Sequence, residues 1–209
     1  MKAVRVHAFG GVDAMVYEDV PKPAAQPGQV LIRVAAAGVG PWDAWIREGK
    51  SVLPQPLPLT LGADLSGAIE EVGPDVAVFR PGDKVFGVTN ARFTGAYAEY
   101  AVAEAAMIAA KPPRLSDVEA VSVPVVGCTA QQMLFDCAWA QAGQTVVVLG
   151  GAGNVGGYAV QLAQLAGARV VATAPPRDFA LLRSWGVAMI VAAGEATPAR
   201  TCGAGGCRD

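Results

Sequence analysis

The chain has 209 residues and a formal net charge of −2, with 16 Lys and Arg residues against 18 Asp and Glu residues. This length can bury a core and form one large or two small domains, and the balanced charge argues against a nucleic acid partner. Apolar stretches are interrupted before they reach the ~20 residues that cross a bilayer, and the N-terminus lacks the apolar region of a signal peptide. We therefore expect a cytoplasmic protein without a membrane partner.

The first half of the chain predicts many short strands separated by Gly- and Pro-rich turns. The segments expected to form strands are 2–7, 15–20, 29–37, 65–72, 85–88, 97–102 and 107–110. Pro41 is suited to the first turn of a short helix that carries Trp42 and Trp45. These features predict a β-rich, barrel-like first domain over residues 1–112.

The next region has helical patterns. Ser116 and Glu119 have the spacing of a capping box. A second helix is expected from about residue 124 to 140, with apolar residues on one face. These residues are Val126, Ala130, Met133, Leu134 and Cys137. Cys128 and Cys137 are interpreted as small buried hydrophobic residues of this helix.

Residues 145–174 have the pattern of a dinucleotide-binding unit. A β-branched run predicts a strand buried on both faces, apolar residues at helical spacing follow, and a second strand begins at Arg169. Between strand and helix, a run of six residues matches G-x-G-x-x-G in the context where this motif is informative. The run is Gly151, Ala152, Gly153, Asn154, Val155 and Gly156.

These six residues are predicted to bind the cofactor, at a helix N-terminus that favours the negative charge of its pyrophosphate. Gly151 is expected to permit the tight turn, Gly153 to let the backbone approach the pyrophosphate, and Gly156 to allow close packing of helix on strand. A glycine-rich turn without a ligand is the alternative.

The end of the second strand indicates which cofactor binds. NAD sites usually carry an acid here to bond the ribose hydroxyls, but this chain has Thr173 and Ala174, with no acid before Asp178. The missing acid removes repulsion against a 2′-phosphate, and Arg177 could bind that phosphate. NADPH is therefore predicted, although Arg177 could equally be a solvated residue at a helix start.

A helix at 178–185 and a strand at 188–192 complete a β-α-β-α-β pattern, so residues 113–193 are predicted to form half of a doubly wound sheet. From Gly194 the apolar periodicity is lost, and residues 194–209 are expected to be the disordered tail of a truncated or frame-shifted product. Cys202 and Cys207 in this tail are interpreted as a fortuitous pair, because no second pair or nearby histidine completes a zinc site.

Several stretches resemble the medium-chain dehydrogenase/reductase superfamily, particularly its zinc-free quinone oxidoreductase branch. The similar segments are residues 28–34, 37–43, 61–67, 81–85, 127–130 and the glycine turn. The resemblance covers about residues 1–193 in the order and spacing of that family. It implies an α/β plus β fold, with a GroES-like N-terminal domain followed by a partial Rossmann domain.

The same resemblance implies hydride transfer from NADPH to a quinone or an α,β-unsaturated carbonyl compound. The zinc alcohol dehydrogenases of this superfamily have a cysteine near Gly40 and Gly-His-Glu where this chain has Gly62-Ala63-Asp64. Both are absent, the only histidine is His7, and no cysteine precedes Cys128, so no metal is expected.

The resemblance also suggests site residues. Asp43 corresponds to the aspartate of the family's N-P-x-D segment and is either catalytic or a cap of the helix start. Trp42 and Trp45 could line an apolar acceptor pocket or pack in the core. Thr129 would lie near the nicotinamide, and His7 is expected to be structural.

Three functions compete: the reductase, a non-catalytic nucleotide-binding relative, and an unstable remnant whose half sheet has an exposed edge. Within the enzymes, an alcohol dehydrogenase-like carbonyl reductase or an enoyl reductase is a further alternative, because pocket shape decides the substrate. A homodimer of the family type is doubtful, since the missing half of the sheet commonly forms that interface.

Overall fold

The computed structural model describes residues 1–194, which form two compact units divided between Val125 and Val126. The expected domain boundary at residue 112 precedes this division. Helix α2 (Asp117–Val121) lies in the first unit, where Ser66 Oγ donates a hydrogen bond of 2.7 Å to Asp117 Oδ1. The greater part of the expected tail, with Cys202 and Cys207, lies outside the described residues.

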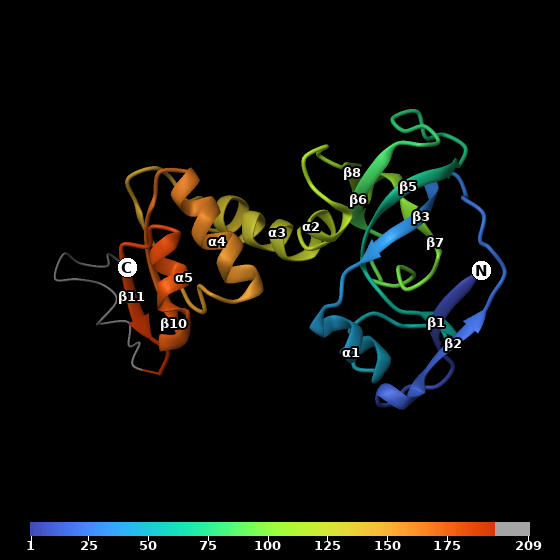
Figure 1. Cartoon of the computed structure of the whole chain (residues 1–209), viewed down its shortest axis with the longest axis horizontal. Helices are drawn as coiled ribbons and strands as arrows, with labels where there is room; N and C mark the ends of the chain where they lie inside the picture. Colours follow the sequence, from blue (N-terminus) through green and yellow to red (C-terminus); the bar gives the residue numbers. More distant parts are fainter. Residues whose placement is uncertain (195–209) are drawn as a thin grey trace. The chain divides into compact units, whose positions relative to one another are not determined.

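The first unit contains two antiparallel sheets, drawn in blue and green in Figure 1. One has the strand order β2-β1-β4, with β1 (Lys2–Val6), β2 (Met15–Asp19) and β4 (Leu59–Thr60). The other has the order β7-β3-β5-β6-β8, with β3 (Gln29–Ala37), β5 (Asp64–Val72), β6 (Lys84–Val88), β7 (Tyr100–Glu104) and β8 (Ile108–Ala110). Helix α1 (Pro41–Arg47) follows β3. The predicted β-rich first part is confirmed.

Two apolar clusters hold this unit together. The five-stranded sheet buries Val30, Ile32 and Leu65, which are fully shielded from solvent. A separate cluster joins Val6 of β1 to Ile46 of α1, together with Leu59 and Leu61. The second cluster therefore fixes α1 against the smaller sheet.

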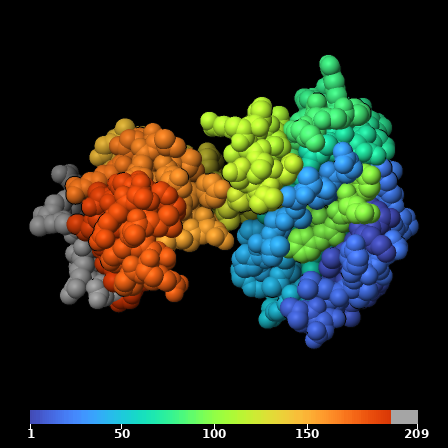
Figure 2. Space-filling view, viewed as in Figure 1, coloured from blue at the N-terminus to red at the C-terminus, as the bar shows by residue number. Residues whose placement is uncertain are grey.

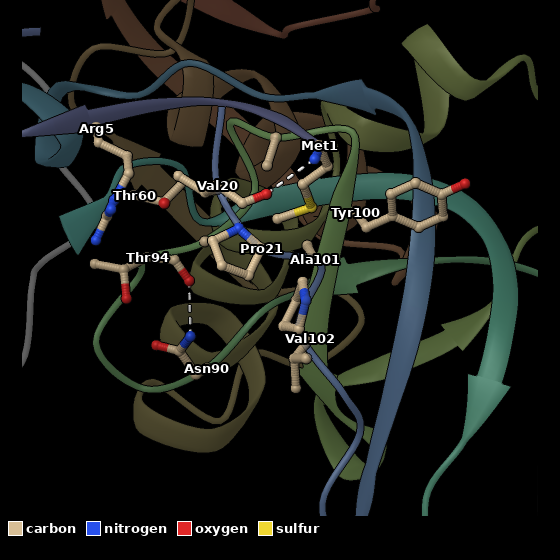
Figure 3. A pocket seen from close by; sticks show the side chains of 13 residues that line it. Met1, Arg5, Val20, Pro21, Thr60, Asn90, Thr94, Tyr100, Ala101 and Val102 are labelled. Atoms are coloured by element: carbon tan, nitrogen blue, oxygen red, sulfur yellow. Dashed lines mark hydrogen bonds between the residues drawn. The ribbon is translucent and has the colours of Figure 1, made fainter. Parts of the chain in front are cut away.

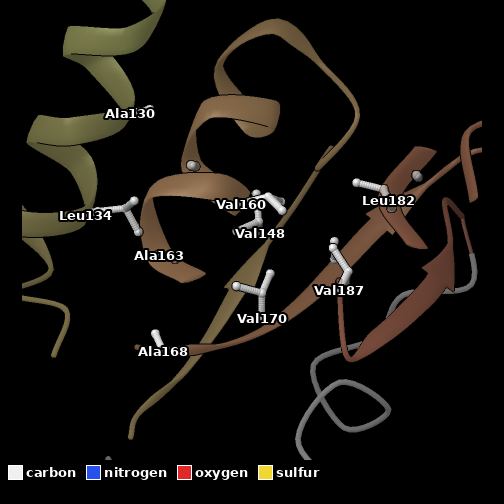
Figure 4. Packing of buried hydrophobic residues seen from close by; sticks show 12 residues of the cluster. Ala130, Leu134, Val148, Val160, Ala163, Ala168, Val170, Leu182 and Val187 are labelled. Atoms are coloured by element: carbon white, nitrogen blue, oxygen red, sulfur yellow. The ribbon is translucent and has the colours of Figure 1, made fainter. Parts of the chain in front are cut away.

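The second unit has a parallel sheet of order β11-β10-β9, formed by β9 (Thr145–Val148), β10 (Arg169–Ala174) and β11 (Met189–Ala192). The connecting helices are α4 (Asn154–Leu165) and α5 (Phe179–Ser184), so the predicted β-α-β-α-β pattern is confirmed. Figure 4 shows Val170 of β10 near Val160 of α4, in the cluster that also contains Leu182 of α5. Alternate residues of β10 enter this core, as the period of a strand requires.

The prediction that the strand at 145–149 is buried on both faces is wrong for the described residues. Within them β9 pairs only with β10 and is an edge strand. Val148 is buried, but Val147 is 38% exposed and Leu149 is 74% exposed. An edge position leaves side chains without the neighbouring strand that would cover them.

The helix expected at 124–140 is α3 (Pro124–Gln131) followed by a π-helix, Gln132–Cys137. The amide of Ala138 bonds the carbonyl of Met133 at 3.1 Å, five residues back, and this wider turn shifts the helical phase. Met133 and Cys137 are exposed, while Leu134 is buried.

The predicted burial of Cys128 and Cys137 is therefore wrong. Helix α3 buries the face of Gly127 and Ala130, and Cys128 lies about 100° around the helix from Gly127. Cys137 is turned outward by the π-helix.

Replacing Leu182 by Ala should lower the free energy of unfolding of the second unit by about 2–5 kcal/mol, because the side chain is fully buried between α5 and β10. Leu165→Ala is the matched control, since Leu165 is 85% exposed on α4. Urea unfolding followed by tryptophan fluorescence measures both variants. Equal losses would contradict the described core.

Candidate functional site

The turn between β9 and α4 is tied to the end of β10 by hydrogen bonds. The amide of Gly151 donates to the Thr173 carbonyl and the amide of Gly150 to Thr173 Oγ1, both at 2.9 Å. The amide of Gly153 donates to the Gly150 carbonyl, also at 2.9 Å. The loop therefore has a fixed shape set by β10.

The glycines of this turn have structural roles that differ from those predicted. Gly151 was expected to permit the tight turn, but it is the preceding Gly150, with φ +73°, that takes the left-handed conformation. A Cβ on Gly151 would lie 2.7 Å from Ala172 Cβ, so Gly151 permits the close approach to β10. A Cβ on Gly156 would lie 2.1 Å from the Gly150 carbonyl oxygen, so Gly156 packs α4 on the turn itself.

The first turn of α4 has the features of an anion-binding site. An α-helix gives its first N–H groups no intrahelical acceptor, and in α4 these belong to Asn154, Val155 and Gly156. Gly153 and Asn154 are exposed, and Ala152 is half-buried. This N-terminus could hold a phosphate-bearing group, because its first backbone donors lack intrahelical acceptors and no Cβ stands at Gly153.

Three candidate residues follow the turn at the end of β10. Thr173 is 6% exposed and its hydroxyl accepts the Gly150 amide, so this side chain supports the turn. Ala174 is buried. Arg177 has an 84% exposed side chain, and its Nε lies 3.8 Å from Asp178 Oδ2. Arg177 is therefore a solvated cation beyond β10.

Thr129 lies on α3 and is half-buried. Its neighbour Ala130 belongs to the core cluster of the second unit.

Asp43 is a buried side chain, 5% exposed, at the start of α1. Its Oδ2 accepts the Gly40 amide at 2.8 Å and the Tyr97 hydroxyl at 2.9 Å. Burial raises the pKa of Asp43, opposed by the Gly40, Tyr97 and Gly62 donors. The hydrogen bond to Gly40 confirms the capping role that was considered for this residue.

Trp42 and Trp45 have different surroundings. The Trp42 ring meets Phe93 edge to face with centroids 6.1 Å apart, and its Nε1 is buried without a hydrogen-bond partner among the described residues. Trp45 is 56% exposed.

Sequence reasoning missed the other members of this polar cluster, Asp64 and Tyr97. Asp64 is 5% exposed, and its Oδ1 accepts the Val125 amide at 2.9 Å. Burial, with a smaller contribution from the Asp43 charge, raises the pKa of Asp64 to about 6. The available signal was an aspartate within the apolar run that begins at Leu61.

Elsewhere in the first unit, a pocket of about 360 Å³ lies beside β7, and Figure 3 shows the side chains that line it. Its polar lining includes Arg5, Thr60, Asn90 and Thr94, and it contains none of the predicted site residues. His7 is exposed, with Nε2 2.7 Å from Glu18 Oε1.

Over residues 1–194, no group of three or more His, Cys, Asp or Glu side chains is arranged to hold a metal ion. In the same range, no helix has the length and apolarity needed to cross a membrane.

Comparison with known proteins places this geometry in a family. Residues 26–113 match the alcohol dehydrogenase GroES-like domain. Human quinone oxidoreductase is 37% identical over 175 residues, which cover 83% of this chain and 53% of the human protein.

Two solved structures extend the similarity over both units. An NAD-dependent alcohol dehydrogenase has a TM-score of 0.85 and 34% identity, covering 92% of this chain and 64% of its own. A mycobacterial protein complexed with NADPH has a TM-score of 0.83 and 31% identity, and the match covers 94% of this chain and 60% of the mycobacterial chain.

A GroES-like unit followed by a parallel sheet with a glycine turn defines an alcohol dehydrogenase-like protein. Both units resemble the medium-chain dehydrogenase/reductase superfamily, and the similar proteins include quinone oxidoreductases. The predicted resemblance is confirmed. The chain spans about half the length of the curated relatives it matches.

Replacing Asp64 by Asn should change how stability depends on pH. Because the folded pKa of about 6 exceeds the ordinary 3.8, the folded state binds the proton more tightly. Wild-type stability relative to Asp64→Asn should therefore fall as pH rises from about 4 to above 6, by on the order of 3 kcal/mol.

Urea unfolding at pH 4.5 and pH 7.5 measures about 2 kcal/mol of this difference, since the unfolded carboxyl is already mostly ionised at pH 4.5. Asp13→Asn, which alters an exposed carboxyl of the same unit, is the control. If wild type and Asp64→Asn showed the same pH dependence, the raised pKa would be refuted.

Proposed function

We propose that the chain binds NADPH and takes part in hydride transfer to a quinone or a related α,β-unsaturated carbonyl compound, without zinc. The carrying observation is the turn between β9 and α4, where Gly156 packs on Gly150 and the amides of the first helical turn have no intrahelical acceptor. The quinone oxidoreductase relatives support the acceptor class. The absence of ligand side chains at Gly40 and Ala63 supports a zinc-free reaction.

The choice of NADPH rests on the residues after β10. Related structures include both an NAD-dependent protein and an NADPH complex, so the relatives do not decide it. A buried Ala174 offers no carboxylate to the ribose, and the exposed Arg177 can meet a 2′-phosphate.

Each residue of the second unit has a binding role in this proposal. The amides of Asn154, Val155 and Gly156 hold the diphosphate, Gly153 leaves room for it, and the Thr173 hydroxyl keeps the turn in place. Thr129 is proposed to lie beside the nicotinamide. The bound nicotinamide would supply the hydride.

The acceptor side belongs to the first unit. Trp42 and Trp45 are proposed to offer apolar surface to a planar acceptor, and Asp43 orients the start of α1. The buried carboxylate of Asp43 already accepts hydrogen bonds from two donors, which favours an orienting role over proton transfer.

NADPH should bind more tightly than NADH. Arg177→Ala should raise the dissociation constant of NADPH about tenfold and change that of NADH by less than about twofold, because only NADPH carries the 2′-phosphate. Nicotinamide fluorescence titration of the full chain measures both. Arg183→Ala, an exposed arginine on α5, is the control. Tighter binding of NADH to the wild type would disprove the NADPH assignment.

Turnover is tested by following NADPH oxidation with 1,4-naphthoquinone as acceptor. Quinone-dependent oxidation supports the reductase. NADPH binding without oxidation favours the non-catalytic relative, and aggregation of the purified chain favours the remnant.

Gly153→Ala should weaken the binding of NADPH about tenfold with little loss of stability. Gly153 has extended backbone angles that alanine accepts, and its Cβ would meet only the Gly150 carbonyl, at 3.2 Å. Gly151→Ala should instead destabilise the unit, because its Cβ would lie 2.7 Å from Ala172 Cβ.

Thermal unfolding and NADPH titration separate these two effects. Gly11→Ala is the control, since nothing lies within 4 Å of its added Cβ. Unchanged NADPH binding in Gly153→Ala would show that the cofactor does not approach this backbone.

A further inference from the structure

The Tyr97 hydroxyl is held rigidly in the first unit. The amide of Tyr97 donates to the Leu61 carbonyl, and its own carbonyl accepts the Val4 amide, both at 2.8 Å. In Figure 2 the green segment that carries Tyr97 lies beside the blue N-terminal strands. The ring lies so close to Gly62 that a Cβ there would be 2.3 Å from Tyr97 Cδ1. The backbone of Tyr97 is thus held by two hydrogen bonds, and its ring packs on the backbone of Gly62.

Tyr97 remains a hydrogen-bond donor at working pH. Burial raises the pKa of its phenol, and the neighbouring Asp43 and Asp64 carboxylates raise it further. The proton therefore stays on the phenol oxygen and is shared with Asp43 Oδ2 at 2.9 Å.

Asp43 connects the Tyr97 hydroxyl to the start of α1 by hydrogen bonds. The carboxylate oxygen that accepts the Tyr97 hydroxyl also accepts the Gly40 amide at 2.8 Å. The Trp42 indole lies directly over Gly40, where an added Cβ would be 2.2 Å from indole Cε2. The position of the indole thus follows from the position of Gly40.

The opposite end of the same helix face is anchored separately. Ile46 is 3% exposed and packs in the cluster that also receives the Tyr97 ring. Asp43 and Ile46 are three residues apart and face the same side of α1. Removing the hydroxyl of Tyr97 would therefore release only the Trp42 end of the helix.

We propose that Tyr97 is a positioning residue for the acceptor site, whose hydroxyl sets the place of the Trp42 indole through Asp43 and Gly40. This inference rests on the proposed function. It assigns substrate alignment to a residue on the segment between β6 and β7, outside every motif that the sequence presented.

Tyr97→Phe removes the hydroxyl and keeps the ring. The KM for 1,4-naphthoquinone should rise on the order of tenfold, as expected for one lost hydrogen bond to a carboxylate. The kcat and the NADPH dissociation constant should change by less than about twofold, because the turn in the second unit is untouched. Tyr100→Phe, a nearby tyrosine whose ring lies under Lys22, is the matched control.

A double-mutant cycle with Asp43→Ala tests the route. If Tyr97 acts through Asp43, the double variant should have the KM of Asp43→Ala alone. Additive effects on KM would overturn the route through Asp43.

A readout without turnover tests the position of the Trp42 indole separately from the proposed function. In the full chain labelled with 5-fluorotryptophan, the ¹⁹F resonance of Trp42 is assigned by its loss in Trp42→Phe. This resonance should shift in Tyr97→Phe, while those of Trp139 and Trp185 in the second unit should stay in place.

The outcomes separate the two proposals. If the wild type oxidises no NADPH with the quinone, the proposed function fails, and the Trp42 resonance alone decides the positioning. An unshifted Trp42 resonance in Tyr97→Phe would overturn the inference, as would an unchanged KM in an active enzyme.

Discussion

The second unit depends on how closely a backbone can approach β10. Gly151 lies against Ala172 at a separation that no Cβ would allow, and Gly156 closes on Gly150 in the same way. Thr173 of β10 adds two hydrogen bonds, because its carbonyl accepts the Gly151 amide and its hydroxyl accepts the Gly150 amide. These contacts hold the strand, the turn and the helix together. The first amides of α4 have a fixed direction because of this contact, and any anion that binds there meets a preformed site.

The first unit is built around buried polar groups instead. Asp43 and Asp64 are both nearly inaccessible to solvent, and their raised pKa values show that burial outweighs the hydrogen bonds they receive. Buried carboxylates reduce stability but hold backbone amides in fixed places, here those of Gly40 and Val125. The fold thus uses a costly pair of acids to connect the helix starts to the sheets.

Most of the fold could be predicted because its signals are local. The strand at Gln29–Ala37 ends at Gly38, and the capping box at Ser116 forms as its spacing indicates, with Ser116 Oγ accepting the Glu119 amide. The glycine motif identified the turn for the same reason. It could not show which of two adjacent glycines takes the left-handed conformation, because Gly150 and Gly151 are chemically identical in sequence.

The polar cluster could not be predicted, since its members meet only in three dimensions. Asp64 and Val125 are separated by 61 positions, and Tyr97 reaches Asp43 across 54. The exposure of the β9 side chains could not be predicted from the sequence either. The edge position of β9 depends on which strands pair, and β4, with two residues, is too short to have a pattern of its own.

The π-helix at Gln132–Cys137 has a consequence for how this chain tolerates insertions and deletions. One wide turn is what a helix forms when it absorbs a single additional residue without moving its ends. Deleting one residue within this segment would restore regular α-helical hydrogen bonding and leave the flanking residues in place, whereas a deletion within the regular helix α3 would rotate everything beyond it by about 100°. The segment Gln132–Cys137 is therefore the part of this helix where a one-residue deletion would leave Ala130 in the core.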